Sequence, residues 1–290
     1  MIAANAIGIR WGTERRLEFI EFRLFWEGGV NRSDLVDEFG VSVPQASKDL
    51  ALYQAQAPDN IRYDRSQKRY FAADTFVPKF IDLDADAYLE RLSPTGHRIV
   101  NIDAVGNYGV EKLPIPQRRI RPGVLRGLLA SARAGQSIDI LYQSMSGGRP
   151  EPLWRRISPH AFASDGLRWH TRAYCHLDHI FKDFILSRCL EVREPGPAGS
   201  VPSEDRIWNS EFSALLIPNP KLSPSQQEVI AQDFRMEDGR AVVTIRCAML
   251  YYFSKRLRLD VADGFDDPRE APVILKNRDE FVVALTEAMR

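Results

Sequence analysis

The segment Leu167–Cys175 places arginine, histidine and tyrosine at alternate positions. If this segment is a β-strand, alternate side chains share a face, so Arg168, His170 and Arg172 point the same way. An arginine fork fits a phosphate or carboxylate, and aromatic rings can stack on a base. The pattern favours a face that binds an anionic ligand, although an exposed sheet face can carry such residues for solubility alone.

Neighbouring segments add further polar residues to this face. Strands are predicted over residues 137–144, 153–160, 167–175 and 181–188, and several short strands at regular spacing suggest a small barrel. We expect one face of the barrel to bind the ligand. Its candidate residues are Tyr142, Ser144, Arg156, His160, Arg168, His170, Arg172, Tyr174 and Arg188.

The same region does not match a metal site or a hydrolytic site. His170 and Cys175 would point to opposite faces of one strand. Adding His176 and His179 yields no standard zinc-ligand spacing. A serine hydrolase needs an orienting acid and a nucleophile elbow, and no GxSxG motif surrounds Ser144. We therefore predict no catalytic residue, no metal and no cofactor.

The N-terminal part of the sequence predicts a helix-turn-helix. A helix over about residues 13–26 is followed by a short second helix and a glycine turn at residues 40–41. Ser42 and Gln45 form a capping box at the start of a third helix over about residues 43–56. Two helices joined by a tight glycine turn are typical of this DNA-binding motif.

The third predicted helix has two distinct faces. The face expected to pack on the first two helices carries Val43, Ala46, Leu50 and Tyr53. The opposite face is the one that enters the major groove in a helix-turn-helix. Glutamine can pair with adenine, and lysine can reach guanine or a phosphate. The candidate DNA-binding residues of this helix are Pro44, Gln45, Ser47 and Lys48.

A basic hairpin is predicted directly after this helix. Residues 61–71 read as two short strands around a polar turn, and Asp64 is the only acidic residue among them. The hairpin resembles the wing of a winged helix, whose basic tip contacts the DNA backbone. Its candidate DNA-binding residues are Arg62, Arg65, Lys68 and Arg69. A basic hairpin can also be a simple solvated edge, but its position after a capped helix favours the wing.

Composition narrows the class of protein. The chain has 290 residues, 44% of them apolar, and 39 Lys and Arg balance 39 Asp and Glu. This length suits two or three domains with their own cores. Zero net charge excludes a uniformly basic DNA coat but allows binding through local patches. Scattered cysteines and the lack of a membrane-length apolar run or a signal peptide lead us to expect a cytoplasmic protein without a membrane partner.

We expect an α+β multidomain chain. The expected parts are a winged helix-turn-helix over residues 1–78, a helical connecting region over 79–132, a ligand-sensing domain over 133–200 and a small α+β extension over 201–290. Residues 195–202 form a linker by composition. The extension is predicted to contain a strand over residues 240–249 and a helix over 279–289.

Four motifs in the strand-rich block carry a family resemblance. They are Tyr142, Arg155–Pro159, Gly166–Tyr174 and Leu186–Arg188. With the winged helix before them, the chain resembles the WYL-domain transcriptional regulators of bacteria and is most similar to the BrxR/CapW-type regulators of anti-phage defence systems. The resemblance covers nearly the whole chain, although the name-giving Trp-Tyr-Leu triplet reads Trp-His-Thr at residues 169–171.

This resemblance implies a fold and a function. The WYL domain would be an Sm/SH3-like β-barrel that senses a nucleotide or nucleic-acid ligand. The winged helix would bind a palindromic operator in double-stranded DNA as a homodimer and repress defence genes, and the C-terminal extension would support dimerisation. The aromatic and basic residues at 251–258 would then face the partner subunit's WYL domain, or form an ordinary amphipathic segment.

Three other functions fit parts of the sequence. The barrel face could make the protein a nucleic-acid-binding accessory module that prefers single strands. It could also serve a nucleotide-processing enzyme, but no acidic metal cluster accompanies it. An activator acting at the same operator is the third alternative. We therefore expect a repressor rather than an enzyme.

Overall fold

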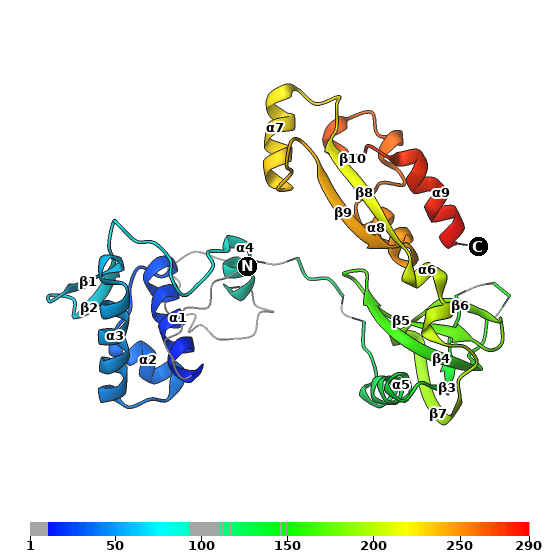
Figure 1. Cartoon of the computed structure of the whole chain (residues 1–290), viewed down its shortest axis with the longest axis horizontal. Helices are drawn as coiled ribbons and strands as arrows, with labels where there is room; N and C mark the ends of the chain where they lie inside the picture. Colours follow the sequence, from blue (N-terminus) through cyan, green and yellow to red (C-terminus); the bar gives the residue numbers. More distant parts are fainter. Residues whose placement is uncertain are drawn as a thin grey trace. The chain divides into compact units, whose positions relative to one another are not determined.

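The computed structural model describes residues 11–92, 111, 113–116, 118–145, 147–148 and 150–289. The chain forms two compact units, Met1–Ile115 and Pro116–Arg290 (Figure 1). The expected connecting region over residues 79–132 is divided between them, because α4 (Ala85–Leu92) lies in the first unit and α5 (Pro122–Ala134) in the second. Within the described ranges, no helix is long and apolar enough to cross a membrane.

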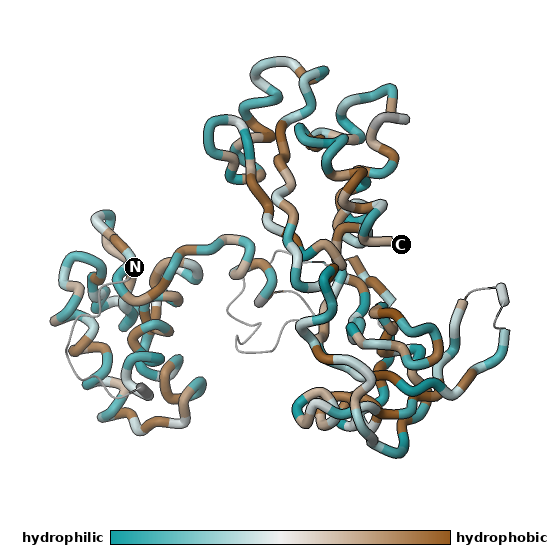
Figure 2. Tube along the Cα trace, turned by 45° about the vertical axis from the view of Figure 1, so that its right-hand side comes forward, coloured by the Kyte–Doolittle hydropathy of each residue, from teal (hydrophilic) through white to brown (hydrophobic). Residues whose placement is uncertain are grey.

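The first unit is the predicted winged helix. Its elements before α4 are α1 (Trp11–Trp26), α2 (Arg32–Phe39), α3 (Val43–Gln56), a 3-10 turn (Pro58–Asn60), β1 (Ile61–Asp64) and β2 (Arg69–Ala72). The strands β1 and β2 form an antiparallel hairpin. Apolar stretches along the helices are visible in Figure 2. The buried core consists of Leu17, Ile20, Leu24, Val30, Leu35, Ala46, Leu50, Tyr53, Ala57 and Ile61.

A buried carboxylate fastens the segment that follows the wing to the helical core. Glu21 on α1 is fully buried. Its Oε2 accepts hydrogen bonds from the backbone N–H groups of Lys79, Phe80 and Ile81 at 3.0, 2.6 and 2.9 Å. Its Oε1 accepts from the hydroxyl of Tyr53 on α3 at 2.9 Å. One side chain therefore joins three segments of the first unit.

A five-stranded antiparallel sheet forms the first half of the second unit. Its strands are β3 (Gln136–Tyr142), β4 (Leu153–Ser164), β5 (Trp169–Cys175), β6 (Ile180–Ile185) and β7 (Cys189–Pro197), with a 3-10 turn (Leu186–Arg188) before β7. The order in the sheet is β6-β5-β4-β3-β7. Among the strands that the structure describes, β6 and β7 are not paired, so the expected closed barrel is not observed. The expected linker at residues 195–202 begins inside β7.

Helix α5 covers one face of this sheet. Val124 and Leu128 of the helix pack on Ile140, Ile157 and other apolar residues of the strands. Apolar and polar residues alternate along the strands as expected. Apolar residues at every second position meet the helix, and polar residues face the other way. The alternation decides which predicted ligand residues can reach solvent or a ligand.

The C-terminal extension is a small α+β module. Its helices are α6 (Arg206–Asn209), α7 (Pro224–Asp233), α8 (Leu250–Arg256) and α9 (Arg278–Ala288), and its strands are β8 (Glu211–Pro218), β9 (Ala241–Arg246) and β10 (Val273–Leu275). Short 3-10 turns lie at Pro202–Glu204, Cys247–Met249, Ala262–Gly264 and Pro268–Glu270. The sheet order is β10-β8-β9. The strand predicted to reach residue 249 ends at Arg246, where the chain turns into α8.

Candidate DNA interface and ligand-binding face

The start of α3 is held by local capping. Gly40 ends α2 in the left-handed conformation, with φ of 62°. The Oγ of Ser42 then accepts from the backbone N–H of Gln45 at 3.4 Å. The predicted second half of the capping box does not form, because the Gln45 side chain turns along the helix instead. The turn and the cap set the angle at which α3 leaves the helical core.

The exposed face of α3 matches the predicted DNA face with one correction. Pro44, Lys48 and Ala51 are exposed, and Ala46 and Leu50 are buried. Val43 was expected to pack in the core, but it is 53% exposed. It is the first residue of the helix, and Cβ atoms tilt toward the helix N-terminus, so its side chain extends beyond the packing surface.

Gln45 is positioned by a buried ion pair. Its amide donates to Oδ1 of Asp49 at 3.0 Å. Asp49 is buried, and its Oδ2 accepts from Nε of Arg16 on α1 at 2.6 Å. The side-chain oxygen and second amide hydrogen of Gln45 are not used in this bond. Ser47 is half-buried, and its hydroxyl donates to the carbonyl of Val43 at 3.0 Å.

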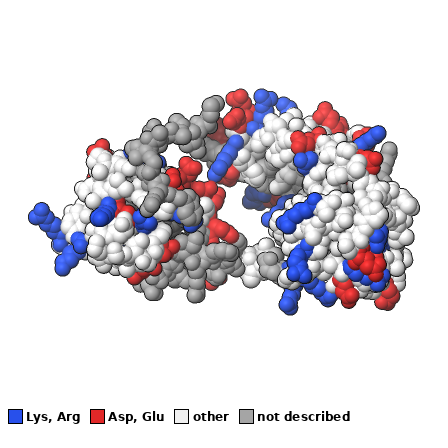
Figure 3. Space-filling model, turned by 60° about the horizontal axis from the view of Figure 1, so that its bottom comes forward, with Lys and Arg blue, Asp and Glu red and all other residues white. Residues whose placement is uncertain are grey.

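The tip of the wing exposes positive charge. Asp64 closes the turn by accepting from the backbone N–H groups of Ser66 at 2.7 Å and Gln67 at 3.1 Å. These bonds, led by one from the Ser66 hydroxyl, lower the pKa of Asp64. Lysine and arginine side chains project from this end of the first unit (Figure 3). The exposed basic residues of the hairpin are Arg62, Arg65 and Lys68.

Arg69 behaves differently from the other basic residues of the wing. Its Nη2 donates to the carbonyl of Gly29 at 2.7 Å and lies 3.9 Å from Asp34 on α2. Its guanidinium therefore holds the wing against the α1–α2 junction. Gly29 allows this approach, because a Cβ on Gly29 would lie 2.5 Å from the carbonyl oxygen of Tyr70.

The predicted ligand residues do not share one face of the second unit's sheet. Tyr142 follows Ile138 and Ile140 on the face that meets α5, and it is buried. Its hydroxyl accepts from the backbone N–H of Ile185 at 3.3 Å, and burial raises its pKa. The expectation that Tyr142 joins the His170 face is therefore wrong, since the pleat places the two on opposite sides.

Other predicted ligand residues lie apart from the centre of this face. Arg156 forms two bonds of 3.0 Å with Asp139 near β7. Tyr174 is half-buried, with its hydroxyl 3.4 Å from Nδ1 of His179. Ser144 follows the end of β3, and Arg188 is half-buried in the 3-10 turn before β7. These residues do not converge on a single pocket.

A buried ion network occupies the centre of the polar face. Arg172 donates from Nε and Nη2 to both oxygens of Asp205, at 2.7 and 3.1 Å, and from Nη1 to Asp183 at 3.3 Å. His160 Nε2 lies 3.0 Å from Asp205. Burial alone would raise the pKa of Asp205, but the bonds from His160 and Arg172 outweigh it and hold that pKa well below its usual range.

A second contact brings α8 to the same face. The hydroxyl of Tyr252 donates to Oδ2 of Asp183 at 3.0 Å and lies 3.4 Å from Nδ1 of His170. The Nε2 of His170 lies 3.4 Å from Asp165, whose other contacts include Arg168 at 2.8 Å. Through Tyr252, the aromatic and basic stretch at residues 251–258 thus touches the sheet of its own chain. Whether this stretch also faces the partner subunit's WYL domain stays a prediction.

Sequence reasoning missed the acids of this network. Asp205 follows the expected linker and caps α6, where it also accepts from the backbone N–H of Trp208 at 3.1 Å. Nothing near it in the sequence indicates that it pairs with Arg172. The only available signal was that several arginines and histidines were expected on one face, because such residues need acidic partners when they are buried.

A basic groove borders the network on its exposed side. It has a volume of about 290 Å³. The segment before α5, the turn between β4 and β5, and α8 line it together. The lining residues are Arg118, Asp165, Leu167, Arg168, Tyr251, Tyr252, Lys255 and Arg256. Of the predicted ligand residues, Arg168 is the one in this groove. In the described ranges, no cluster of three or more His, Cys, Asp or Glu could hold a metal ion.

Comparisons with known proteins agree with this domain order. The BrxR transcriptional regulator winged helix-turn-helix domain matches residues 12–94, the WYL domain matches 123–194, and the BrxR C-terminal dimerization domain matches 213–281. A winged helix followed by a WYL domain defines a transcriptional regulator. The chain belongs to the BrxR/CapW family of WYL-domain regulators, and the matched domains are those of regulators rather than enzymes.

Curated relatives match over nearly the whole length. The DNA-binding transcriptional repressor CapW of Escherichia coli (strain KTE188) is 37% identical over 97% of this chain and 94% of its own. CapW of Stenotrophomonas maltophilia is 38% identical over 97% of this chain and 94% of its own. Among solved structures, proteasome accessory factor B/C of Arthrobacter aurescens covers 99% of this chain and 50% of its own at 16% identity, but the TM-score of 0.26 is too low to bear on the fold.

Proposed function

We propose that this protein is a transcriptional repressor that binds a palindromic operator as a homodimer and controls a bacterial anti-phage defence operon. The observation that carries the proposal is the exposed N-terminal face of α3, with Pro44 and Lys48, together with the exposed basic tip of the wing. The relatives named as DNA-binding repressors support it, because they match nearly the whole chain. Such a protein acts on chromosomal DNA in the cytoplasm.

The contacts to DNA divide into two groups. Gln45 and Lys48 would approach base edges in the major groove, with Pro44 and Ser47 beside them. Arg62, Arg65 and Lys68 would contact phosphates. Arg69 would act indirectly, since its bond to Gly29 sets the position of the wing. Fixed Gln45 geometry favours base selection, because its amide is already oriented by Asp49.

The homodimer would form through the C-terminal extension. The match to a dimerization domain over residues 213–281 supports this. Several large apolar side chains of the extension are exposed in the single chain, as expected of a surface that a second copy covers. They are Val229, Phe234, Val242, Val282, Val283 and Met289.

We place the effect of the ligand at the Asp205 network. A nucleotide or nucleic-acid phosphate entering from the basic groove would compete with the Asp205 carboxylate for Arg172 and His160. Because Asp205 belongs to the C-terminal extension and Arg172 to the WYL sheet, this competition would alter how the two parts pack. The ligand would release the operator only if it binds the rearranged state more tightly. We also propose that this five-stranded sheet corresponds to the Sm/SH3-like barrel that the family resemblance implies.

Operator binding tests the proposal. Footprinting of the purified protein on DNA upstream of its own gene should reveal an inverted repeat. Lys48→Ala should weaken binding about tenfold or more, since a base contact is lost. Arg65→Ala should reduce the slope of log K against log salt concentration by about one, because one phosphate contact is lost. Arg133→Ala, at an exposed arginine near the end of α5 and outside the DNA face and the extension, is the matched control.

The outcomes are distinct. If Lys48→Ala and Arg65→Ala bind the operator as well as Arg133→Ala does at fixed salt, the assigned DNA face is wrong. If the protein prefers single strands in a competition with duplex DNA, the accessory-module function replaces the repressor. A reporter assay that shows higher expression with the gene than without it would identify an activator.

A further inference from the structure

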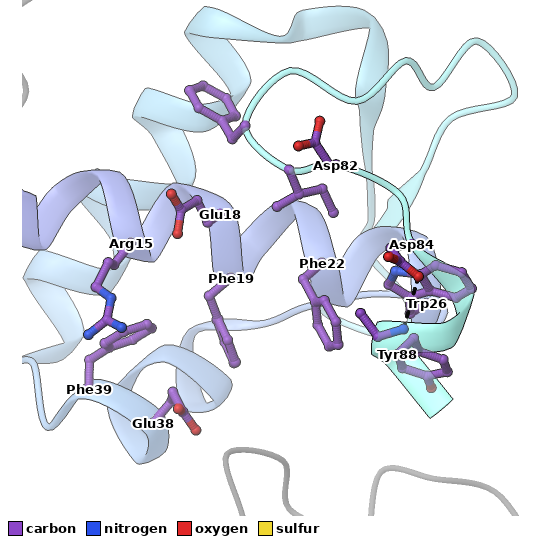
Figure 4. Close-up of a pocket in the computed structure, with 13 residues that line it drawn as sticks. Arg15, Glu18, Phe19, Phe22, Trp26, Glu38, Phe39, Asp82, Asp84 and Tyr88 are labelled. Carbon is purple, nitrogen blue, oxygen red and sulfur yellow. Dashed lines mark hydrogen bonds between the residues drawn. The ribbon is translucent and has the colours of Figure 1, made fainter. Parts of the chain in front are cut away.

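A cavity in the first unit lies away from the DNA face. It has a volume of about 450 Å³, within the size range of small-molecule sites. One face of α1, the end of α2, the segment at residues 80–84 and α4 line it (Figure 4). Neither α3 nor the wing contributes to it, so the proposed DNA contacts leave it accessible.

Aromatic rings form the walls of this cavity. Phe19 and Phe22 point into it side by side from α1 (Figure 4). Phe39 meets Phe19 edge to face, with centroids 5.3 Å apart. Trp26 and Tyr88 stack at 4.5 Å with an interplanar angle of 9°. Such rings offer electron-rich faces that attract a cation.

Carboxylates surround these walls. Glu18, Glu38, Asp82 and Asp84 line the cavity, against Arg15 as the only basic lining residue. In the part of the chain that the structure describes, no salt bridge is formed by Glu18, Glu38 or Asp82. Burial raises the pKa of Glu38, and Arg23 offsets this only in part. With four acidic lining residues against one arginine, the cavity is negative as well as aromatic.

We propose that this cavity binds a small organic cation with an aromatic body. Aromatic walls suit the body of such a ligand by burial and stacking, and the carboxylates suit its charge. An anion would face four carboxylates, and a neutral ligand would leave their charge uncompensated. The volume of the cavity, about 450 Å³, favours a small molecule over a peptide. This site is separate from the WYL ligand face and does not depend on the repressor assignment.

Two probes of opposite charge and similar shape test the charge preference. Tetraphenylphosphonium should bind the full-length protein saturably, with one site per chain in isothermal titration calorimetry. Tetraphenylborate should not bind at the same concentrations. The affinity for tetraphenylphosphonium should fall as salt is raised, because the carboxylates lie partly exposed. Equal binding of the two ions, or binding of neither, would overturn the proposal.

Conservative variants locate the site. Glu38→Gln and Glu18→Gln keep side-chain size and should each weaken tetraphenylphosphonium binding about fivefold. Asp37→Asn is the control, because Asp37 is an exposed acid next to Glu38 that does not line the cavity. Circular dichroism confirms that each variant is folded. If all three variants bind the cation like the wild type, the cavity is not its site.

Discussion

Buried carboxylates connect segments that lie far apart in the sequence. Asp49 pairs with Arg16, Glu21 holds three backbone N–H groups, and Asp205 pairs with Arg172 across 33 residues. A buried charge is costly unless it is paired and hydrogen-bonded. Removing one partner therefore destabilises more than the pair itself contributes.

Asp205→Asn tests the network between the WYL sheet and the C-terminal extension. The substitution leaves Arg172 buried with only Asp183 as a charged partner. We expect the free energy of unfolding to fall by about 3–5 kcal/mol, measured by urea denaturation. Asp267→Asn removes an exposed pair with Arg269 and should cause no measurable change. Equal stabilities of the two variants would contradict a role for Asp205 in holding these parts together.

His170 makes stability depend on pH. Burial lowers its pKa from the ordinary 6.5, and the bond to Asp165 offsets this only in part. The folded chain thus favours the neutral ring more than the unfolded chain does. This contribution to stability is complete above the unfolded pKa and is lost as pH falls through 6.5 toward the lower folded pKa.

Denaturation at about pH 7.5 and about pH 5.5 measures this effect. In His170→Gln, the loss of stability between these values should be smaller than in the wild type. A residual loss is expected, because burial also lowers the pKa of His176. The same loss in both proteins would show that His170 does not titrate as described.

The wing and the helix-turn-helix act as one element because of a close approach at Gly29. The carbonyl of Tyr70 and the side chain of Arg69 both meet the backbone there. Val30 adds an isolated antiparallel β-bridge to Tyr70, which joins the segment between α1 and α2 to the hairpin. The base of the wing is thereby fastened to the junction between α1 and α2.

Gly29→Ala should separate these parts. The new Cβ would lie 2.5 Å from the Tyr70 carbonyl oxygen, at a φ of +149°. We expect the free energy of unfolding, measured by thermal denaturation, to fall by about 3 kcal/mol or more. Operator binding should weaken as well. Gly28 has a φ of +70°, but a Cβ there would meet open space. Gly28→Ala should therefore lower the free energy of unfolding by only about 1–2 kcal/mol. Similar losses in both variants would argue against the close approach.

For the whole molecule, balanced charge is a constraint on DNA binding. The chain has 39 basic and 39 acidic residues, so its positive surface is local. A neutral protein with small basic patches should bind non-specific DNA weakly and depend on base contacts and two half-sites for its operator. In the proposed mode of operator binding, dimerisation would supply affinity as well as symmetry.

Sedimentation of the full chain tests the dimer. We expect a dimer at micromolar concentrations. Val229→Glu should shift the equilibrium toward the monomer, because Val229 is 55% exposed on α7 beside an apolar hollow. Val77→Glu, at an exposed valine of the first unit, is the control. A monomeric wild type would contradict the proposed mode of operator binding.

Local patterns in the sequence were enough to predict much of the fold. The helix cap at Ser42, the glycine turn at residues 40–41, the hairpin at 61–71 and the alternation along β5 all depend on residues close in sequence. The winged helix and the exposed positions of Pro44 and Lys48 followed from them, whereas the family followed from the resemblance of the motifs in the strand-rich block. The exposure of residues within one helix or one hairpin was therefore predictable, apart from Arg69 and Val43, whereas their contacts with DNA stay a prediction.

Contacts between distant segments needed the folded chain. Arg172 alone reads as a residue open to a ligand, and only packing brings Asp205 and Asp183 to it. Tyr142 reads as polar, yet α5 covers its face of the sheet. The cavity between α1, α2 and α4 likewise has no signature in any one segment. Periodicity specifies which face of an element a residue occupies, but what covers that face depends on chain topology.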